Sequence, residues 1–263
     1  MSYDYLTYRV EDRIAYVTID RPEVLNALHP EASAELARAF DAFRTNPDAW
    51  VAVLTGSGDR AFSAGNDLKV TAARSGDGDM AIPQGVPFGG ITSGFECTKP
   101  IIAAVNGFAL GGGFELALAC DVIIAADHAR FGLPEPLVGL VASAGGMHRL
   151  PRHVPLKVAM GMMLTGRQID AAEAYRLGLV NEVVPLPELL PSARRWAAEM
   201  LRCSPVSLRT TKEAVLAGLG LPDDAALQAD RDSGRLRRLY ESEDFIEGPR
   251  AFAEKRPPEW TGR

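Results

Sequence analysis

Runs of apolar residues predict strands in the first half of the chain and helices in the second. Residues 5–20 predict a β-hairpin, because two segments rich in β-forming residues flank the polar turn Glu11-Asp12-Arg13. Residues 30–44 predict a helix, since Pro30 suits a first turn and apolar residues recur at helical spacing. Short apolar runs predict buried strands at 50–55, 101–105 and 121–126, with a helix at 114–119.

Strand, helix and strand in close succession indicate a parallel sheet with crossover connections, and therefore an α/β fold. The pattern from residue 145 onward is largely helical. We expect a core with the active site over residues 1–185 and a helical region of the same functional unit over 186–263. Residues 71–92 are rich in glycine and lack periodicity, which predicts a mobile surface loop that orders against a ligand.

Composition narrows the class of protein. The chain has 263 residues, is 47% hydrophobic and 24% charged, and carries a formal charge of -6. Basic residues are scattered, so no nucleic-acid partner is expected. Apolar runs fall short of the ~18–20 residues that span a bilayer, and the polar N-terminus resembles no leader, so we expect a cytoplasmic protein without a membrane partner. The cysteines form no ligand cluster and are interpreted as structural residues: Cys97, Cys120 and Cys203.

Two turns of small residues are candidates for binding through the backbone. The first is the glycine-rich stretch 107–113, which does not fit a dinucleotide motif and precedes a predicted helix. Its glycines indicate either tight packing or bare N–H groups that face a ligand oxygen. The second turn, 63–67, is either an ordinary loop or a second source of such donors. Residues 61–65 and 141–145 nearly match a serine-hydrolase elbow, but each lacks the first glycine.

Two acidic residues follow these structural units. Glu115 comes directly after the glycines in an otherwise apolar segment, where it is either a helix-capping acid or a catalyst. Glu135 lies in a proline-flanked loop after the strand 121–126, where it is either a solvated acid or a catalyst. Carboxylates at the ends of adjacent α/β units can converge on one cleft. Asp121 and the four histidines are interpreted as structural: His29, His128, His148 and His153.

A series of short motifs spans nearly the whole chain. These motifs resemble, in order, those of the enoyl-CoA hydratase/isomerase, or crotonase, superfamily. They include Asn26-Ala27-Leu28, Ala61-Phe62-Ser63-Ala64-Gly65-Asn66-Asp67-Leu68, Lys99-Pro100-Ile101, Ala109-Leu110-Gly111-Gly112-Gly113-Phe114-Glu115, Phe131-Gly132-Leu133-Pro134-Glu135, Ala144-Gly145-Gly146, Leu164-Thr165-Gly166, Gly178-Leu179-Val180 and Phe252-Ala253-Glu254-Lys255-Arg256.

The resemblance implies a fold and a reaction. The fold is a crotonase-like spiral of ββα turns followed by a C-terminal helical trimerisation region. The reaction is reversible addition of water to the C2=C3 bond of a trans-2-enoyl-CoA, as in fatty acid β-oxidation. The backbone N–H groups of Asn66 and Gly112 would form the oxyanion hole. Glu115 would deprotonate the water, and Glu135 would supply the proton to C2.

The resemblance also implies further contacts and an assembly. Coenzyme A enters as part of the substrate, and neither a metal nor a redox cofactor is expected. A homotrimer or a dimer of trimers is expected, with Phe252 and Lys255 reaching the CoA of a neighbouring subunit. The residues expected to contact substrate or CoA are Ala64, Asp67, Leu68, Lys69, Phe252 and Lys255.

Two departures leave the substrate open. Asn66 replaces the alanine of typical hydratases, and Ala142-Ser143 stands where many have proline and glycine. The residues on either side of Glu115 and Glu135 also resemble those of carnitinyl-CoA dehydratase-like members. A Δ3,Δ2-enoyl-CoA isomerase is also possible in this superfamily, although it needs only one acid. A non-catalytic acyl-CoA-binding or assembly protein would keep the glycines but has no need for both acids.

Overall fold

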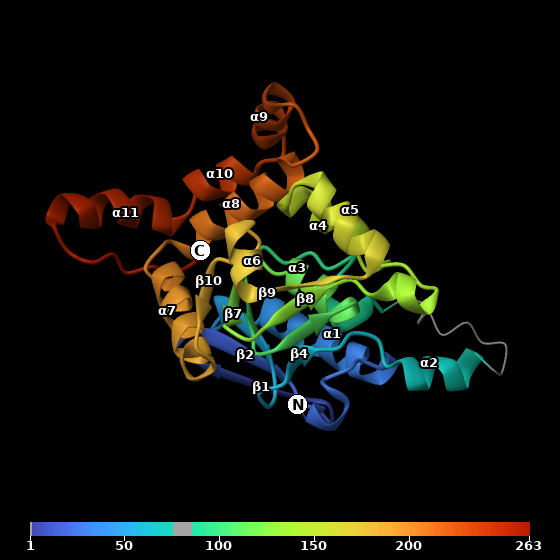
Figure 1. Cartoon of the computed structure of the whole chain (residues 1–263). Coiled ribbons are helices and arrows are strands. Elements are labelled where there is room, and N and C mark those ends of the chain that lie inside the picture. The colour runs from blue at the N-terminus through green and yellow to red at the C-terminus, as the bar shows by residue number, and fades with distance from the viewer. Residues whose placement is uncertain (1, 76–85) are drawn as a thin grey trace. The chain divides into compact units, whose positions relative to one another are not determined.

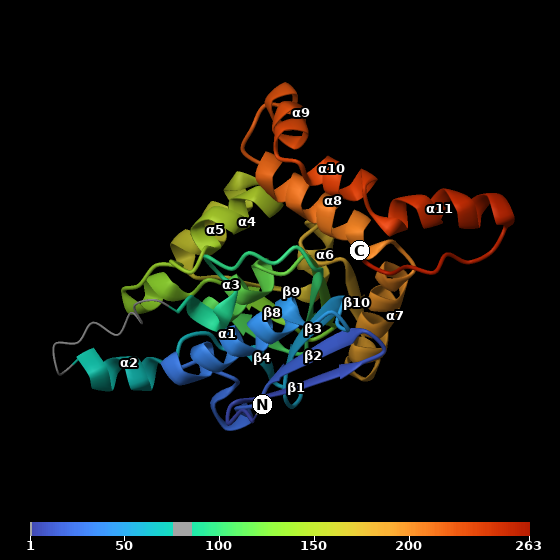
Figure 2. The ribbon, with the colours of Figure 1, turned by 180° about the vertical axis from the view of Figure 1, so that it is seen from behind.

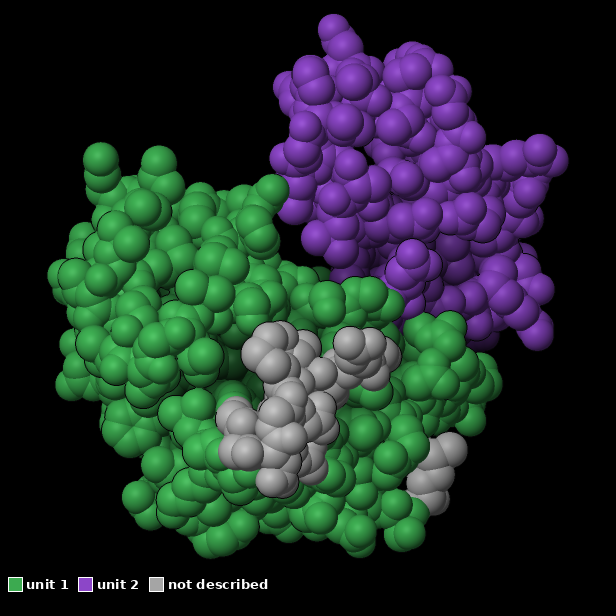
Figure 3. Space-filling view, turned by 90° about the vertical axis from the view of Figure 1, so that its right-hand side faces the viewer, with its two compact units in different colours: residues 1–95, 101–195 green, residues 96–100, 196–263 purple. Residues whose placement is uncertain are grey.

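The computed structural model describes residues 2–75 and 86–263. The chain forms two compact units, which are coloured separately in Figure 3. Unit 1 consists of Met1–Phe95 and Ile101–Arg195, and unit 2 consists of Glu96–Pro100 and Trp196–Arg263. Both predicted glutamates and both predicted oxyanion amides belong to unit 1.

The N-terminal hairpin of unit 1 is confirmed. Strands β1 (Leu6–Glu11) and β2 (Ile14–Ile19) pair antiparallel, and the connection consists of Asp12 and Arg13. Both of these residues have positive φ angles, 51° and 64°. A two-residue loop of this kind matches the right-handed twist of the flanking strands, so it fixes the register of the hairpin.

A six-stranded sheet in the order β1-β2-β3-β5-β7-β10 forms the first layer of unit 1 (Figures 1 and 2). Within this sheet β2, β3, β5, β7 and β10 run parallel to one another. Every residue of β3 and β5 is buried, as expected for a parallel sheet covered on both faces. The three predicted buried strands are confirmed, whereas β10 lies in the region predicted to be mainly helical. The bounds are β3 (Val51–Gly56), β5 (Ile101–Val105), β7 (Val122–Ala126) and β10 (Glu182–Val184).

A four-stranded sheet in the order β4-β6-β8-β9 forms the second layer. Consecutive strands alternate between the sheets, so that β3, β5 and β7 are each followed by a partner in the second sheet. The chain therefore winds as a spiral, and the expected fold class is confirmed. Three-residue strands show no readable alternation of apolar and polar positions, which is why the pattern along the chain did not predict them. Their bounds are β4 (Ala61–Ser63), β6 (Phe108–Leu110), β8 (Arg130–Gly132) and β9 (Gln168–Asp170).

Helices connect the strands of unit 1. The predicted helices over 30–44 and 114–119 are confirmed as α1 and α3, although α3 begins two residues earlier, within the glycine run. His29 caps α1, since its Nδ1 accepts a hydrogen bond from Ala32 N at 3.0 Å. The helices are α1 (Pro30–Thr45), α2 (Leu68–Ser75), α3 (Gly112–Leu118), α4 (Gly146–His153), α5 (Leu156–Thr165) and α6 (Ala171–Arg176), with 3-10 turns η1 (Pro22–Val24), η2 (Phe88–Gly90), η3 (Glu135–Val138) and η4 (Leu186–Glu188).

The prediction of an irregular loop over residues 71–92 is wrong at both ends of the segment. Residues 71–75 belong to the helix α2. Asp67 precedes this helix, and its Oδ1 accepts a hydrogen bond from Val70 N in the first turn. At the other end, Gly89 and Gly90 are buried: a Cβ on Gly90 would lie 2.5 Å from the Ala37 backbone of α1. Glycine density here reflects close packing rather than an open loop. Residues 76–85 of the prediction lie outside the described residues.

Helices make up the C-terminal part of the chain, as predicted. Helix α7 (Leu189–Leu201) contributes residues to both units, and α8 (Pro205–Gly218), α9 (Asp223–Asp232), α10 (Arg235–Tyr240) and α11 (Glu243–Glu254) belong to unit 2. Buried Asp244 ties the C-terminal tail to α11, since its Oδ1 accepts hydrogen bonds from Thr261 N and Gly262 N. Across the described ranges, no helix is long and apolar enough to cross a membrane.

Candidate active site

The turn that follows β4 is built on Asn26. This residue is fully buried with a φ of 55°, and its Nδ2 donates to Ala61 O at 2.7 Å. Ser63 Oγ donates to Asn26 O at 2.8 Å and accepts from Gly65 N at 3.1 Å. The Asn26 motif and the 61–68 motif are therefore one structural unit. Because the Ser63 hydroxyl is buried and committed to the backbone, it does not fit the nucleophile of a hydrolase elbow.

The two small-residue turns pack directly against each other. A Cβ on Gly65, which has a φ of +88°, would lie 2.8 Å from Gly112 N and 2.6 Å from Leu110 O. A Cβ on Gly113 would lie 2.0 Å from Ser63 O. These approaches are too close for any side chain, so glycine is required for packing at both positions. The contact also brings the backbone of residue 66 near that of residue 112.

The amides of Asn66 and Gly112 are left available by this packing. Leu28 and Asn66 form an isolated parallel β-bridge. Its hydrogen bonds run from Leu28 N to Gly65 O at 2.7 Å and from Asp67 N to Leu28 O at 3.0 Å. The bridge uses the groups on either side of Asn66, so its own N–H points away. Gly112 begins α3, where N–H groups have no intrahelical acceptor. Within the described ranges, neither amide donates a hydrogen bond to the protein.

Glu115 is buried, with 3% of its surface exposed. Its Oε1 accepts a hydrogen bond from Gly146 N at 2.8 Å, at the start of α4. The carboxyl thus bonds to another helix, which does not fit the interpretation of Glu115 as a simple cap of α3. The pKa of Glu115 is raised to about 7: burial is the largest cause and the charge of Glu135 adds to it, whereas the Gly146 amide and the Arg149 charge act in the opposite direction.

Glu135 turns inward at the start of η3. Its Oε1 lies 3.1 Å from the position that a Cβ on Gly111 would occupy. Its Oε2 is buried, and no hydrogen-bond partner reaches it among residues 2–75 and 86–263. Burial raises the pKa of Glu135 as well. The half-buried side chain lies against the glycine turn, which favours the interpretation as a catalytic acid over that of a solvated loop acid.

The two carboxyl groups flank one short segment of backbone. Glu135 contacts Gly111, and Glu115 N donates to Gly111 O at 3.0 Å. The available Gly112 amide lies between them in sequence. Burial raises the pKa of both acids, and the charge of Glu135 contributes to the raised pKa of Glu115, so the two groups influence each other's protonation. The arrangement suits general acid–base chemistry beside an anion-stabilising pair of amides.

An apolar cavity of about 320 Å³ opens beside Glu135. Glu135 is its only charged lining residue in the described part of the chain. Ala142, one of the departures noted in the sequence, stands in the cavity wall. Apolar pockets with one or two placed polar groups are typical of small-molecule sites. The lining residues are Leu133, Glu135, Pro136, Val141, Ala142, Met147, Met160, Met163 and Leu164.

The remaining predicted contact residues lie in different settings. Ala64 is partly buried, and its amide donates to Leu25 O at 2.9 Å. Asp67 is buried and paired with Arg21 at 3.2 Å, so the fold itself uses its carboxylate. Leu68 and Lys69 are exposed on the first turn of α2.

In unit 2, Phe252 is 86% exposed and Lys255 is also exposed, just after α11. Asn66 is exposed as well, but its Nδ2 donates to Thr71 Oγ1 at 2.8 Å. This bond occupies part of the polar side chain that the sequence left free for substrate.

Some site residues had no signal in the sequence. Phe88 was counted in the loop, yet a Cβ on Gly112 would lie 2.4 Å from its Cε1, so its ring lies against the oxyanion turn. Arg149 lies in a helix with no motif that marks chemistry. Only the Ala144-Gly145-Gly146 motif could have indicated that Gly146 contacts Glu115.

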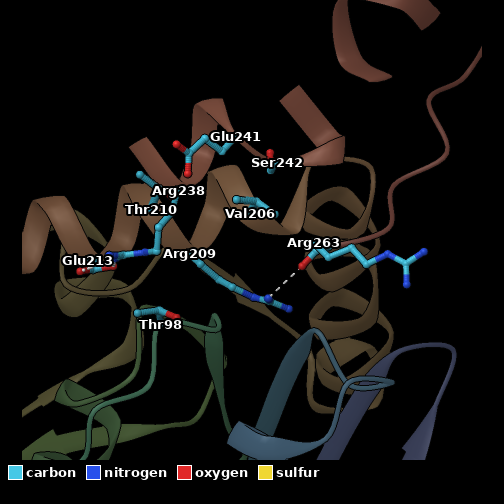
Figure 4. A pocket seen from close by; sticks show the side chains of 10 residues that line it. Thr98, Val206, Arg209, Thr210, Glu213, Arg238, Glu241, Ser242 and Arg263 are labelled. Carbon is cyan, nitrogen blue, oxygen red and sulfur yellow. Dashed lines mark hydrogen bonds and ion pairs between the residues drawn. The ribbon is translucent and has the colours of Figure 1, made fainter. Parts of the chain in front are cut away.

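A larger cavity, of about 560 Å³, lies within unit 2 (Figure 4). Its acids are already paired: Glu213 with Arg238 at 2.8 Å, and Glu241 with Arg237 at 2.8 Å. Both carboxylates of this cavity are therefore engaged in ion pairs, unlike those of Glu115 and Glu135. Among the residues that the structure describes, no cluster of three or more His, Cys, Asp or Glu side chains could hold a metal ion.

Comparison with known proteins gives consistent matches. Residues 9–263 match the enoyl-CoA hydratase/isomerase family. Carnitinyl-CoA dehydratases from Citrobacter koseri and Salmonella arizonae are 45% and 46% identical to the chain, and each alignment covers 95% of both sequences. Crystal structures of enoyl-CoA hydratases from Mycobacterium marinum (EchA1) and Mycobacterium tuberculosis match with TM-scores of 0.91 at 38% and 39% identity, covering 98% of this chain and 99% of theirs.

The raised pKa of Glu115 makes a prediction about stability. Between pH 4.5 and 7 the native protein holds a proton at Glu115 that the unfolded chain has released. Stability from this group is thus present below pH 4.5 and is lost as the pH rises through 7. Relative to Glu115→Gln, which does not titrate there, the wild type should lose about 2–3 kcal/mol of unfolding free energy over this range. Urea denaturation of both proteins at a series of pH values measures the difference, and parallel curves would contradict the raised pKa.

Proposed function

The chain belongs to the enoyl-CoA hydratase/isomerase family, as its motifs predicted, and we propose that it reversibly hydrates the C2=C3 double bond of a 2-enoyl-CoA thioester. The observation that carries this proposal is the pair of inward-facing carboxyls, Glu115 and Glu135, on either side of a glycine turn with an available amide. Hydration needs a base and an acid at one water, together with donors for the charge that develops on the thioester oxygen.

Each step of the proposed reaction uses a group of unit 1. The thioester oxygen accepts hydrogen bonds from the amides of Asn66 and Gly112. Ionised Glu115 takes a proton from water as the oxygen of that water bonds to C3, and the C2=C3 electron pair moves to form an enolate. Protonated Glu135 then supplies a proton to C2, and the carbonyl is restored. Proton exchange through the pair resets it, and dehydration is the same sequence in reverse.

The similarity to carnitinyl-CoA dehydratases favours a second candidate, the same chemistry on a cationic acyl group. The cavity supports the first candidate better. Eight of its lining residues are apolar, and the one carboxyl among them has a raised pKa and a proposed catalytic role. A quaternary ammonium group is usually held by aromatic rings, whereas this wall consists of aliphatic and thioether side chains. An uncharged acyl chain therefore fits the described lining better.

An isomerase or a binding protein would need fewer of the groups in this site. A Δ3,Δ2-enoyl-CoA isomerase moves one proton and needs one acid, so a second buried carboxyl beside the first has no task. An acyl-CoA-binding protein needs neither acid. Leaving a buried carboxyl oxygen without a partner costs on the order of 1–3 kcal/mol, and this cost is understandable where the oxygen takes part in chemistry.

Substitution of either glutamate tests the mechanism. Glu115→Gln and Glu135→Gln should each lower the rate of crotonyl-CoA hydration by about 10²–10⁴-fold, the usual effect of losing a positioned acid or base. Because both act on one water, the double variant should be less impaired than the product of the single effects. Hydration is followed by the loss of enoyl thioester absorbance. Glu173→Gln is a matched control, since Glu173 is a helical glutamate with surface ion pairs.

Binding separates catalysis from recognition in the same variants. Affinity for a saturated acyl-CoA should change little, because the amides of Asn66 and Gly112 remain. Near-wild-type turnover in either folded single variant would remove that residue from the mechanism. Full activity in both variants would return the chain to an acyl-CoA-binding role.

A substrate panel distinguishes the two acyl classes. We expect turnover of uncharged trans-2-enoyl-CoA thioesters to exceed that of crotonobetainyl-CoA by at least tenfold in kcat/KM. Activity should persist in EDTA, because two carboxylates and two amides supply every step. Preference for crotonobetainyl-CoA would instead assign the chain the reaction named for its relatives, and metal-dependent activity would contradict the proposed mechanism.

We also propose a homotrimer or a dimer of trimers, with Phe252 and Lys255 contacting the CoA bound by a neighbouring subunit. Unit 2 exposes several large apolar side chains, which would be covered in such an assembly. Light scattering at micromolar concentration should give three or six times the chain mass of 28.3 kDa, and a monomer would refute the assembly. The exposed residues include Val215, Leu216, Leu219, Leu227, Ile246 and Phe252.

A further inference from the structure

Arg149 of α4 is partly buried, and its charge acts on Glu115. Its Nη2 donates to Thr92 O at 2.8 Å, and its Nη1 donates to Ala144 O at 3.3 Å. A Cβ on Gly145, which has a φ of +109°, would lie 1.9 Å from Nη1. The guanidinium therefore packs on the backbone of the turn at residues 144–146, where the positive φ of residue 145 favours glycine.

Arg149 is connected to Glu115 through the turn at residues 144–146. The turn that it packs against ends at Gly146, and the Gly146 amide donates to Glu115 Oε1 at 2.8 Å. A Cβ on Gly146 would lie 3.1 Å from this oxygen. A shift of the turn by a few tenths of an ångström would thus alter either the hydrogen bond or the contact. The positive charge of Arg149 also favours the ionised form of Glu115.

Arg149 is connected to the oxyanion turn through Thr92 and Phe88. Thr92 Oγ1 donates to Phe88 O at 2.7 Å, and the Phe88 ring lies against Gly112. Residues 88–92 also pack against α1 and the rest of α3: a Cβ on Gly90 would lie 2.5 Å from the Ala37 backbone, and a Cβ on Gly89 would lie 2.9 Å from a Leu116 methyl carbon. The segment 88–92 is therefore a strap between the Gly112 amide and Arg149.

We propose that Arg149 is a positioning residue that joins the two halves of the site, tying the strap at 88–92 that covers Gly112 to the turn at 144–146 that holds Glu115. This inference rests on the proposed hydratase function for its catalytic consequence. Arg149 itself touches no reacting atom. A guanidinium suits this task because its planar fork reaches two carbonyls in different segments at once, which a lysine ammonium on a flexible stem does not reproduce.

The charges around this cluster determine the expected pH effect. Glu115 faces Glu135 of η3 and Arg149 of α4, and Arg149 in turn faces Glu115, Cys120 after α3, and His153 at the end of α4. Removing the Arg149 charge removes one of the groups that favour ionised Glu115, so the pKa of Glu115 rises. Since the ionised carboxylate is the base, the acidic limb of the pH profile for kcat/KM moves to higher pH.

Three variants test the proposal in the full-length protein. Arg149→Gln removes both the charge and the fork, Arg149→Lys keeps the charge, and Arg152→Gln is a matched control on the exposed side of the same helix. Arg149→Gln should lower kcat about 10- to 100-fold, since small displacements of catalytic groups have effects of this size, and it should move the acidic limb to higher pH. Arg149→Lys should lower kcat but keep the limb in place. Arg152→Gln should match the wild type.

Hydrogen exchange gives a readout that needs no substrate. Peptides containing residues 88–92 and 144–147 should exchange faster in both Arg149 variants and should not in Arg152→Gln. Unchanged exchange together with an unmoved acidic limb in folded Arg149→Gln would overturn the proposal. If that variant does not fold, wild-type exchange and turnover in Arg149→Lys would overturn it. A wild type that hydrates no enoyl-CoA would refute the proposed function. The exchange data would still show whether Arg149 holds residues 88–92 and 144–146 together.

Discussion

The site depends on one close contact between two backbone turns. The turn after β4 and the start of α3 approach so closely that Gly65 and Gly113 have no room for a Cβ. The spiral makes this contact possible, because β4 and β6 are neighbours in the second sheet and deliver both turns to the same edge. Once the turns touch, the amides of Asn66 and Gly112 are available together, and everything else is arranged around them.

Burial then gives two ordinary glutamates their chemical character. Neither Glu115 nor Glu135 has a salt-bridge partner among the described residues, and desolvation is the main cause of the raised pKa of each. The Gly146 amide moderates the effect on Glu115 by favouring the charged form. The net of burial, the neighbouring amides and the charges of Glu135 and Arg149 is a pKa of about 7 for Glu115, which suits proton exchange near neutral pH in the proposed reaction.

The cavity wall shows why family membership does not fix the substrate. The proposed catalytic groups lie on α3 and η3, whereas much of the wall comes from α4 and α5 and includes Met147, Met160 and Met163. Thioether side chains are flexible and adapt to the shape of an apolar guest. Relatives can therefore keep the same acids and amides while their walls select different acyl groups.

The sequence by itself determined the fold class and the identity of the candidate groups. Continuous apolar runs gave the buried strands β3, β5 and β7, and the ordered motifs indicated the family, the glycine turns and both glutamates. The second sheet came only through the family resemblance, because strands of three residues carry no periodic signal of their own.

Tertiary structure decided what each group does. Whether Glu135 faces water or the glycine turn, and whether Glu115 caps its own helix or bonds to α4, depends on contacts between residues distant in the chain. The same holds for Phe88, which glycine density assigned to an open loop although it packs against Gly112, and for Arg149, whose partners are carbonyls. Burial, and the pKa values that follow from it, are properties of the surroundings of a residue. They arise only when the chain has folded and water has been excluded.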